Sequence, residues 1–181
     1  SLEDVAREAK KRLEDLKKKI TDLIREARRK HKESHDRLRE LVEKIKEDLK
    51  RVLKKLEDDG SSREKLERLK RKVDELAREL EEVLKRHKEN VDRSDEELKR
   101  VLKRIEEEIK RLEDELEEVK KDGSDVREVK EKLRRTVEAL DERIDKLRKE
   151  LDENVRRLDK EIEDMVRKAK KVVDELREEI R

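Results

Sequence analysis

The sequence predicts an all-α protein with three long, nearly straight helices in an up-down-up antiparallel three-helix bundle. Three observations lead to this class: apolar residues recur at helical spacing, proline is absent, and the only two glycines mark two short breaks. Most of the remaining residues are Glu, Lys, Arg and Asp, and the first three of these are good helix formers. Such a composition with a helical period is typical of long helices.

Two short breaks predict where the helices end. They are Asp-Asp-Gly-Ser-Ser at 58–62 and Lys-Asp-Gly-Ser-Asp at 121–125, and we expect loops at 59–61 and 122–125. A glycine just past a helix end can take the left-handed conformation that closes the helix. The helices are expected at about 2–58, 62–121 and 125–180. Because both loops are short, the outer helices should run parallel and the middle one antiparallel, in a single domain over 1–181.

Capping signals follow both breaks. Ser61 with Glu64, and Asp125 with Glu128, have the three-residue offset of a capping box. Ser1 is placed to cap the first helix in the same way. These signals support helix starts directly after each break.

Each expected helix carries one apolar stripe whose pattern repeats every five helical turns, or about 18 residues. One column of the stripe holds Leu80, Leu98 and Leu116, and another holds Leu140, Leu158 and Leu176. This period matches the natural winding of a straight helix, so we expect little supercoiling. No single helix can bury its stripe alone, and three should therefore pack around a shared core.

The composition excludes several classes of function. The 57 Lys and Arg residues nearly balance the 55 Asp and Glu residues, which weakens any electrostatic case for nucleic acid or membrane lipid as a partner. Without Phe, Trp or Tyr there is no base-stacking platform, and without Cys there is no disulfide, thiolate zinc site or cysteine nucleophile. We find no catalytic signature, membrane span or targeting signal, and expect a soluble protein without enzymatic activity, cofactor or required partner, consistent with cytoplasmic recombinant expression.

The matched helix lengths, the five-turn repeat and the Gly-Ser loops make the chain resemble de novo designed, parametrically generated helical bundles. Spectrin repeats have a similar topology but usually carry aromatic core residues and irregular loops. The resemblance implies a very stable structural scaffold with no natural biochemical activity. Many members of this class also contain buried hydrogen-bond networks.

Polar residues interrupt the apolar columns near the middle of each expected helix. His31 stands between Leu13 and Leu49, and His87 stands between Leu69 and Ile105. The interrupting residues are His31, Ser34, His87, Ser94 and Asn154, with His35 and Asn90 one position away from their columns.

Folding the chain back at the two breaks brings these polar residues to one level. Ser34 should lie opposite His87 and His31 opposite Asn90, while Asn90 and Ser94 bracket the level of Asn154. All seven residues are therefore expected in one central slab of the bundle. His, Ser and Asn side chains each donate and accept hydrogen bonds, so a closed buried network can form there. Its expected role is specificity of helix packing.

Other interpretations of these polar residues remain open at this stage. His31 and His35, at positions i and i+4, could bind zinc together with His87 and leave an open fourth position. The second helix could instead break between His87 and Ser94, since Ser-Asp-Glu-Glu at 94–97 resembles a capping box. Buried histidines could also make the bundle pH-responsive, because desolvation lowers the pKa of an imidazole.

An interaction module is a further alternative. The stripe is widened by apolar residues whose number could exceed what three helices can bury. These residues are Val42, Leu53, Leu84, Leu102, Val155, Val166 and Val173. Such a surplus could drive self-association or admit an added helix.

Overall fold

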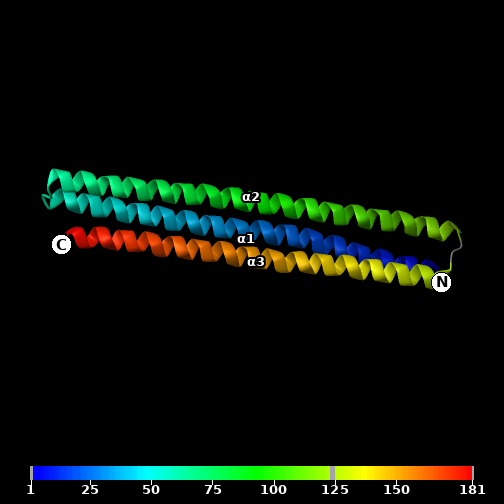
Figure 1. The fold of residues 1–181 in the computed structure, drawn as a ribbon. Helices are drawn as coiled ribbons and strands as arrows, with labels where there is room; N and C mark the ends of the chain where they lie inside the picture. The colour runs from blue at the N-terminus through cyan, green and yellow to red at the C-terminus, as the bar shows by residue number, and fades with distance from the viewer. Residues whose placement is uncertain (1, 123–124, 181) are drawn as a thin grey trace. The chain divides into compact units, whose positions relative to one another are not determined.

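A computed structural model describes residues 2–122 and 125–180 of the chain, and these form three α-helices (Figure 1). They are α1 (Leu2–Asp58), α2 (Arg63–Asp122) and α3 (Val126–Ile180). The described residues contain no strand. The predicted all-α three-helix fold is thus confirmed, and α2 and α3 begin one residue later than expected. The cap predicted at Ser1, and Gly123 and Ser124 of the second loop, lie outside the described residues.

Contacts divide the helices into two compact units, each containing one stretch of every helix. The first unit comprises Ser1–Arg29 and Arg93–Glu153, and the second comprises Lys30–Asp92 and Asn154–Arg181. Each unit is a three-helix bundle with its own core. A single domain over residues 1–181 stays a prediction.

Ion pairs in the first unit give the direction of α3 relative to α1. Lys19 of α1 pairs with Asp141 of α3, and Glu26 pairs with Arg148 at 3.8 Å. Moving seven residues along α1 moves the contact seven residues along α3, so the two helices run parallel. All four residues are half-buried at the edge of the core, where contact with water keeps the contribution of each ion pair to stability small.

The middle helix runs the opposite way. Arg143 of α3 pairs with Glu108 of α2 at 2.9 Å, and Lys132 pairs with Glu115 at 3.6 Å. Between these two pairs the residue number falls on α3 and rises on α2, so the two helices run antiparallel. In the second unit α2 and α3 are also in contact, since Glu179 lies near both Arg68 and Lys72.

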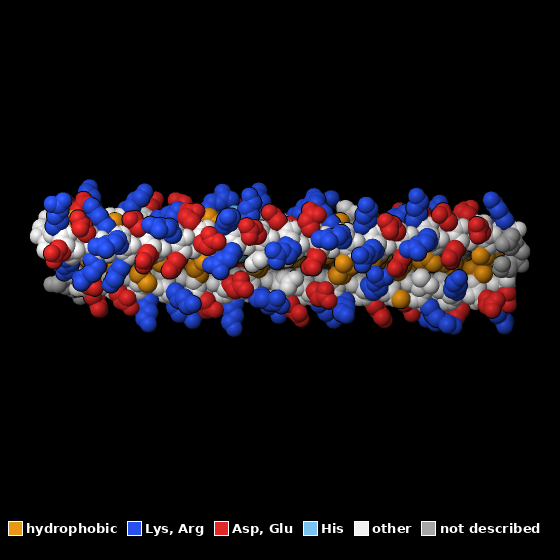
Figure 2. Space-filling view, turned by 45° about the horizontal axis from the view of Figure 1, so that its top comes forward, with side chains coloured by type: hydrophobic (Ala, Val, Ile, Leu, Met, Phe, Trp, Pro, Cys, Tyr) orange, Lys and Arg blue, Asp and Glu red, His pale blue; other side chains and the backbone are white. Residues whose placement is uncertain are grey.

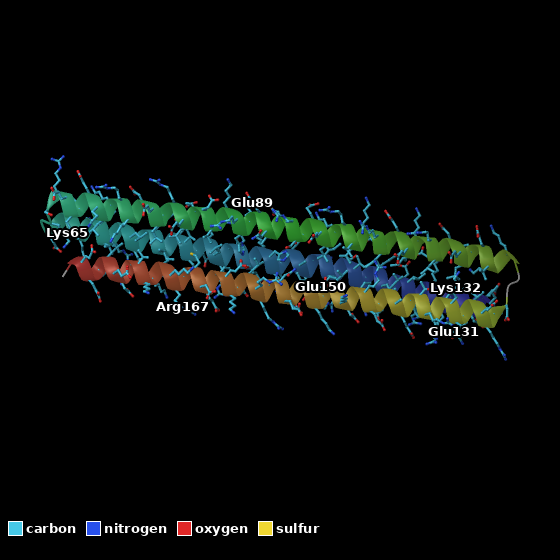
Figure 3. The ribbon with its side chains drawn as sticks, viewed as in Figure 1. Lys65, Glu89, Glu131, Lys132, Glu150 and Arg167 are labelled. Atoms are coloured by element: carbon cyan, nitrogen blue, oxygen red, sulfur yellow. The ribbon has the colours of Figure 1, made fainter. Side chains whose placement is uncertain are left out.

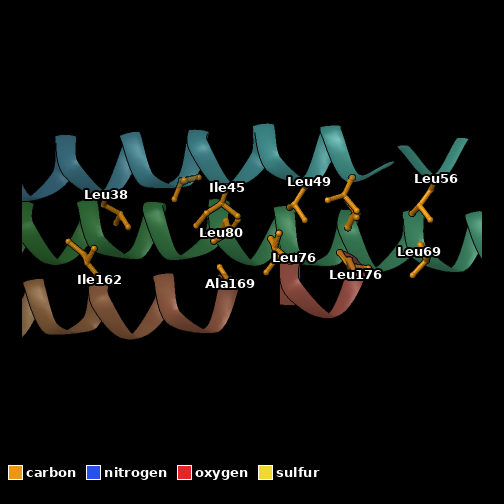
Figure 4. Packing of buried hydrophobic residues seen from close by; sticks show 14 residues of the cluster. Leu38, Ile45, Leu49, Leu56, Leu69, Leu76, Leu80, Ile162, Ala169 and Leu176 are labelled. Carbon is orange, nitrogen blue, oxygen red and sulfur yellow. The ribbon is translucent and has the colours of Figure 1, made fainter. Parts of the chain in front are cut away.

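The apolar stripe forms the core of both units. In α1, Ile20, Leu38 and Leu56 recur every five turns and are each 0% exposed. Figure 4 shows buried side chains of the second unit's core, to which all three helices contribute, among them Leu49 of α1, Leu69 of α2 and Leu176 of α3. The described residues include no exposed large hydrophobic side chain.

Two details of the expected stripe need correction. Leu98 is half-buried, although Leu80 and Leu116 in its column are buried. The residues that widen the stripe are also covered to different extents. Val42, Leu102 and Val173 are buried, whereas Leu53, Leu84, Val155 and Val166 are half-buried.

The turn between α1 and α2 follows the expected chemistry at its glycine. Gly60 has φ = 69°, in the left-handed region, and its N–H donates to the carbonyl oxygen of Glu57 at 3.4 Å. Asp59 N–H donates to the Lys55 carbonyl at 2.9 Å. These bonds close the last turn of α1.

Ser62, rather than Ser61, caps α2. The backbone N–H of Lys65 donates to Ser62 Oγ at 3.3 Å. The predicted capping box at Ser61 and Glu64 is wrong, because the helix starts one residue later and Lys65 takes the position that would need a carboxylate. At α3 the predicted cap at Asp125 is confirmed, since Arg127 N–H donates to Asp125 Oδ1 at 3.1 Å, and the part of Glu128 in that capping box stays a prediction.

The surfaces of the helices are densely charged. Figure 2 shows Lys and Arg interspersed with Asp and Glu over the face it presents. Side chains such as Glu89 of α2 and Arg167 of α3 project away from their helices (Figure 3). None of the described helices has a stretch both long and apolar enough to cross a membrane.

Candidate buried polar network

Three polar residues of the second unit occupy positions that the repeat gives to core hydrophobics. His31, Ser34 and His87 are 2%, 4% and 5% exposed. The residues five turns before and after each of them are equally buried Leu, Val or Ile. A polar side chain at such a position is costly unless it forms hydrogen bonds.

His87 meets this requirement through both of its ring nitrogens. Its Nε2 lies 3.2 Å from Ser34 Oγ, and its Nδ1 lies 3.3 Å from His35 Nδ1. The His35 and His87 rings are stacked, with centroids 5.5 Å apart and planes inclined by 23°. One side chain of α2 therefore joins two side chains that α1 places on adjacent positions.

The chain Ser34–His87–His35 can be completed in two ways when both rings are neutral, since each ring then carries one N–H. In the first, His35 Nδ1–H donates to His87 Nδ1, and His87 Nε2–H donates to Ser34 Oγ. In the second, Ser34 O–H donates to His87 Nε2, and His87 Nδ1–H donates to His35 Nδ1. Both arrangements pair both nitrogens of His87.

Burial lowers the pKa of His35, and nearby charges act on it in both directions. The cation of Arg39 on α1 and that of Lys88 on α2 lower the pKa further. The carboxylates of Asp36 and Asp92 raise it. Desolvation is the largest contribution, so the neutral ring is favoured.

The pKa of His87 is also lowered, again mainly by burial. Positive charge on His35 or His31 would lower it further, and the carboxylate of Asp159 on α3 opposes the shift. Asp159 is not part of the apolar stripe, so the sequence pattern did not predict that it lies near His87.

Hydrogen bonds join three of the seven predicted residues, Ser34, His35 and His87, and a fourth, His31, is buried close enough to His87 for its charge to lower the pKa of that ring. The prediction that Ser34 lies opposite His87 is confirmed by the hydrogen bond between them. His35 is half-buried, as is Asn154 on the α3 stretch of the same unit. Ser94 is half-buried and belongs to the first unit.

Asn90 is exposed, so its predicted place in the buried network is wrong. It stands three residues after His87, which turns it about 60° around α2. That rotation carries it from the core to the rim of a groove that faces α3.

Two of the alternative interpretations do not fit this geometry. Helix α2 is continuous from Arg63 to Asp122, so the predicted break between His87 and Ser94 is wrong. The residues that the structure describes contain no group of three His, Cys, Asp or Glu side chains placed to hold a metal ion. His31, His35 and His87 are thus not placed as a set of three ligands in this geometry.

Sequence reasoning missed a second feature of this unit, the groove between α2 and α3. Its floor includes Ala169, which follows Leu133 and Leu151 in one column of the repeat. The change from leucine to alanine is visible in the sequence. Alanine is also apolar, however, so it does not interrupt the hydrophobic pattern as histidine does.

Comparison of the chain with family models, with curated proteins and with solved structures gave no match.

Proposed function

We propose that the protein is a structural helical bundle of the designed kind, without catalytic activity, in which a buried polar network specifies how the helices pair. The observation that carries the proposal is the double hydrogen bonding of buried His87 to Ser34 and His35. The strict repeat and the regular loops support the designed origin.

The five-turn repeat of apolar residues does not by itself specify a single register between the helices. Because apolar columns recur every five turns, a helix displaced by that length would still place Leu, Val or Ile against Leu, Val or Ile. His31, Ser34 and His87 are each the only polar residue in their column of the helix. A displaced pairing would set His87 against an apolar residue and leave its two nitrogens without partners, at a cost of about 1–3 kcal/mol for each buried unpaired group.

The network is therefore expected to contribute to uniqueness of pairing more than to stability. Replacing a buried polar group and its partner together by apolar residues of similar shape is often neutral or stabilising. The loop between α1 and α2 prevents large displacement within one chain. Displaced pairing thus concerns separate chains that associate during refolding.

Cysteine cross-linking tests this proposal, since the chain has no cysteine of its own. Lys46 of α1 and Glu81 of α2 form an ion pair, so Lys46→Cys with Glu81→Cys reports the native register. Lys46→Cys with Arg63→Cys reports a register displaced by five turns. Each pair is refolded from denaturant at high concentration and treated with a short bismaleimide.

With the network intact, only the native pair should cross-link, within single chains. In a Ser34→Val/His87→Leu background, the displaced pair should also cross-link and give dimers on a denaturing gel. A Leu16→Val/Leu69→Ile background, changed in the same columns but without loss of polar groups, is the matched control. Equal cross-linking of the displaced pair in all three backgrounds would contradict the proposal.

A further inference from the structure

A groove of about 750 Å³ runs between α2 and α3 within the second unit, lined by apolar side chains and by polar ones that include His87 and Asn90. Its walls are Leu76, Leu80 and Val83 of α2 and Met165, Ala169 and Val172 of α3. Leu80 and Ala169 are buried and form the floor, whereas Val83, Met165 and Val172 are half-buried along the sides. Alanine stands at position 169 where its column elsewhere has leucine, so less side-chain volume fills this part of the unit.

The length of the groove matches a short helix. It extends along α2 from Leu76 to Asn90, which at the rise of an α-helix is roughly 21 Å, or four helical turns. A helix lying between two neighbouring helices completes a four-helix arrangement and buries an apolar stripe on each side.

The rims of the groove carry charges in an alternating pattern. All four charged residues line the groove, and the register set by the Arg68–Glu179 pair puts Glu79 of α2 level with Lys168 of α3, and Arg86 level with Glu161. All four residues are exposed. On each helix the two charges are opposite in sign and seven residues apart, which is the spacing of flanking positions in paired helices.

We propose that this groove binds one amphipathic α-helix of a separate partner chain, about four turns long, with flanks complementary to these four charges. Beside α2, the partner carries a cation near Glu79 and an anion near Arg86. Beside α3, it carries an anion near Lys168 and a cation near Glu161. Asp164, on the α3 rim between the last two, favours a further cation at the centre.

A second folded copy of the chain is a poorer occupant. It would present the same concave face, and the described surface has no exposed large hydrophobic side chain that could fill the groove. A separate helix, in contrast, offers a convex apolar stripe. This inference goes beyond the proposed pairing role of the network and does not depend on it.

Two synthetic helical peptides of identical composition provide the test. Both carry a leucine stripe four turns long. The matched peptide has the complementary flanking charges, and the swapped peptide has each flanking Lys and Glu exchanged. Fluorescence anisotropy of labelled peptide is followed while the full chain is added at low salt. The matched peptide should bind about tenfold more tightly, since four favourable contacts replace four repulsive ones.

Two variants of the chain decide whether the groove is the site. The combined change Glu79→Lys, Arg86→Glu, Glu161→Lys and Lys168→Glu keeps the net charge and should reverse the peptide preference. Met165→Glu, which places a charge in the wall, should remove binding of both peptides while circular dichroism reports an unchanged helix content. A control with Glu142→Lys and Lys146→Glu, exposed positions of the first unit, should bind as the original chain does.

Equal affinity for the two peptides, or no binding of either, would overturn the inference. Light scattering tests whether the chain instead associates with a second copy of itself through the groove. Self-association of the original chain that Met165→Glu abolishes would show that a second copy occupies the groove, and would also overturn it. Ser34, His35 and His87 are unchanged throughout, so failure here is distinct from failure of the network proposal.

Discussion

The Nδ1 atoms of His35 and His87 lie 3.3 Å apart, across the interface between α1 and α2. A hydrogen bond between two such nitrogens needs one N–H and one lone pair. The pair therefore holds its geometry with two neutral rings of unlike protonation, or with one neutral ring and one cation. Two cations would set N–H against N–H and break the bond.

The two neutral rings should be opposite tautomers. Whichever direction the hydrogen bond takes, one ring carries its proton on Nδ1 and the other on Nε2. Long-range ¹H–¹⁵N spectra of the histidine rings at pH 8 distinguish these forms. Two Nε2–H rings, the common form in water, would contradict the observed contact, whereas Ser34→Ala should leave the unlike pair in place.

Acid should weaken the fold through His35 and His87. Burial lowers the pKa of both rings below the ordinary 6.5, so between the folded-state pKa and 6.5 the unfolded chain binds more protons. The free energy of unfolding should thus decrease as pH falls through about 6.5 and level off below the folded-state pKa, with each pKa unit corresponding to about 1.4 kcal/mol.

Charged side chains on all three helices also affect the pKa values of His35 and His87. Asp36 and Arg39 on α1, Lys88 and Asp92 on α2, and Asp159 on α3 are common to any variant that changes only the two rings. Chemical denaturation at pH 7.5 and 5.5 should therefore show a smaller pH effect in His35→Gln/His87→Gln than in the original chain. Equal losses in the two proteins would show that the rings are not the source.

A buried leucine of α2 should contribute strongly to stability. Leu102 is 1% exposed, and Leu102→Ala should lower the free energy of unfolding by about 2–5 kcal/mol through lost burial and a residual cavity. Lys99, three residues earlier, has a side chain 45% exposed, and Lys99→Ala should cost under about 0.5 kcal/mol. Urea denaturation of both variants measures the difference, and similar losses would show that the core is misassigned.

The two serines before α2 should differ in their contribution. Ser62→Ala removes the acceptor for Lys65 N–H and should destabilise the fold by about 0.5–2 kcal/mol. Ser61→Ala serves as the control and should be close to neutral. Thermal unfolding followed by circular dichroism compares them, and a larger effect at Ser61 would place the cap at the residue first expected from the sequence.

The fold was predictable because the information is periodic and local. Spacing of Leu, Val and Ile specifies the buried face, and Gly60 marks the end of α1, with no long-range knowledge required. Even the contact between Ser34 and His87 followed from counting back across a short loop. The direction in which a side chain points around its helix was harder to predict. Asn90 lies at the same height along the helices as the network but is turned away from it, because position along a helix does not give rotation about the helix axis.

The groove could not be predicted from the same pattern. Ala169 keeps the column apolar, so the binary pattern is unchanged while the filled volume falls. Packing depends on the summed shapes of side chains from three helices, and a hydrophobic pattern records only their polarity. Hydrogen-bond direction and local charge, such as that of Asp159, likewise emerge only from the assembled helices.

The absence of Phe, Tyr and Trp has a practical consequence for the buried histidines. Their three imidazoles are the only aromatic rings among 181 residues, so every aromatic proton resonance of the protein comes from His31, His35 or His87. Stacking of two of these rings should displace their resonances through ring currents. In D₂O, once the N–H protons have exchanged, the aromatic region of a proton spectrum therefore reports on the three histidine rings alone, without isotope labelling.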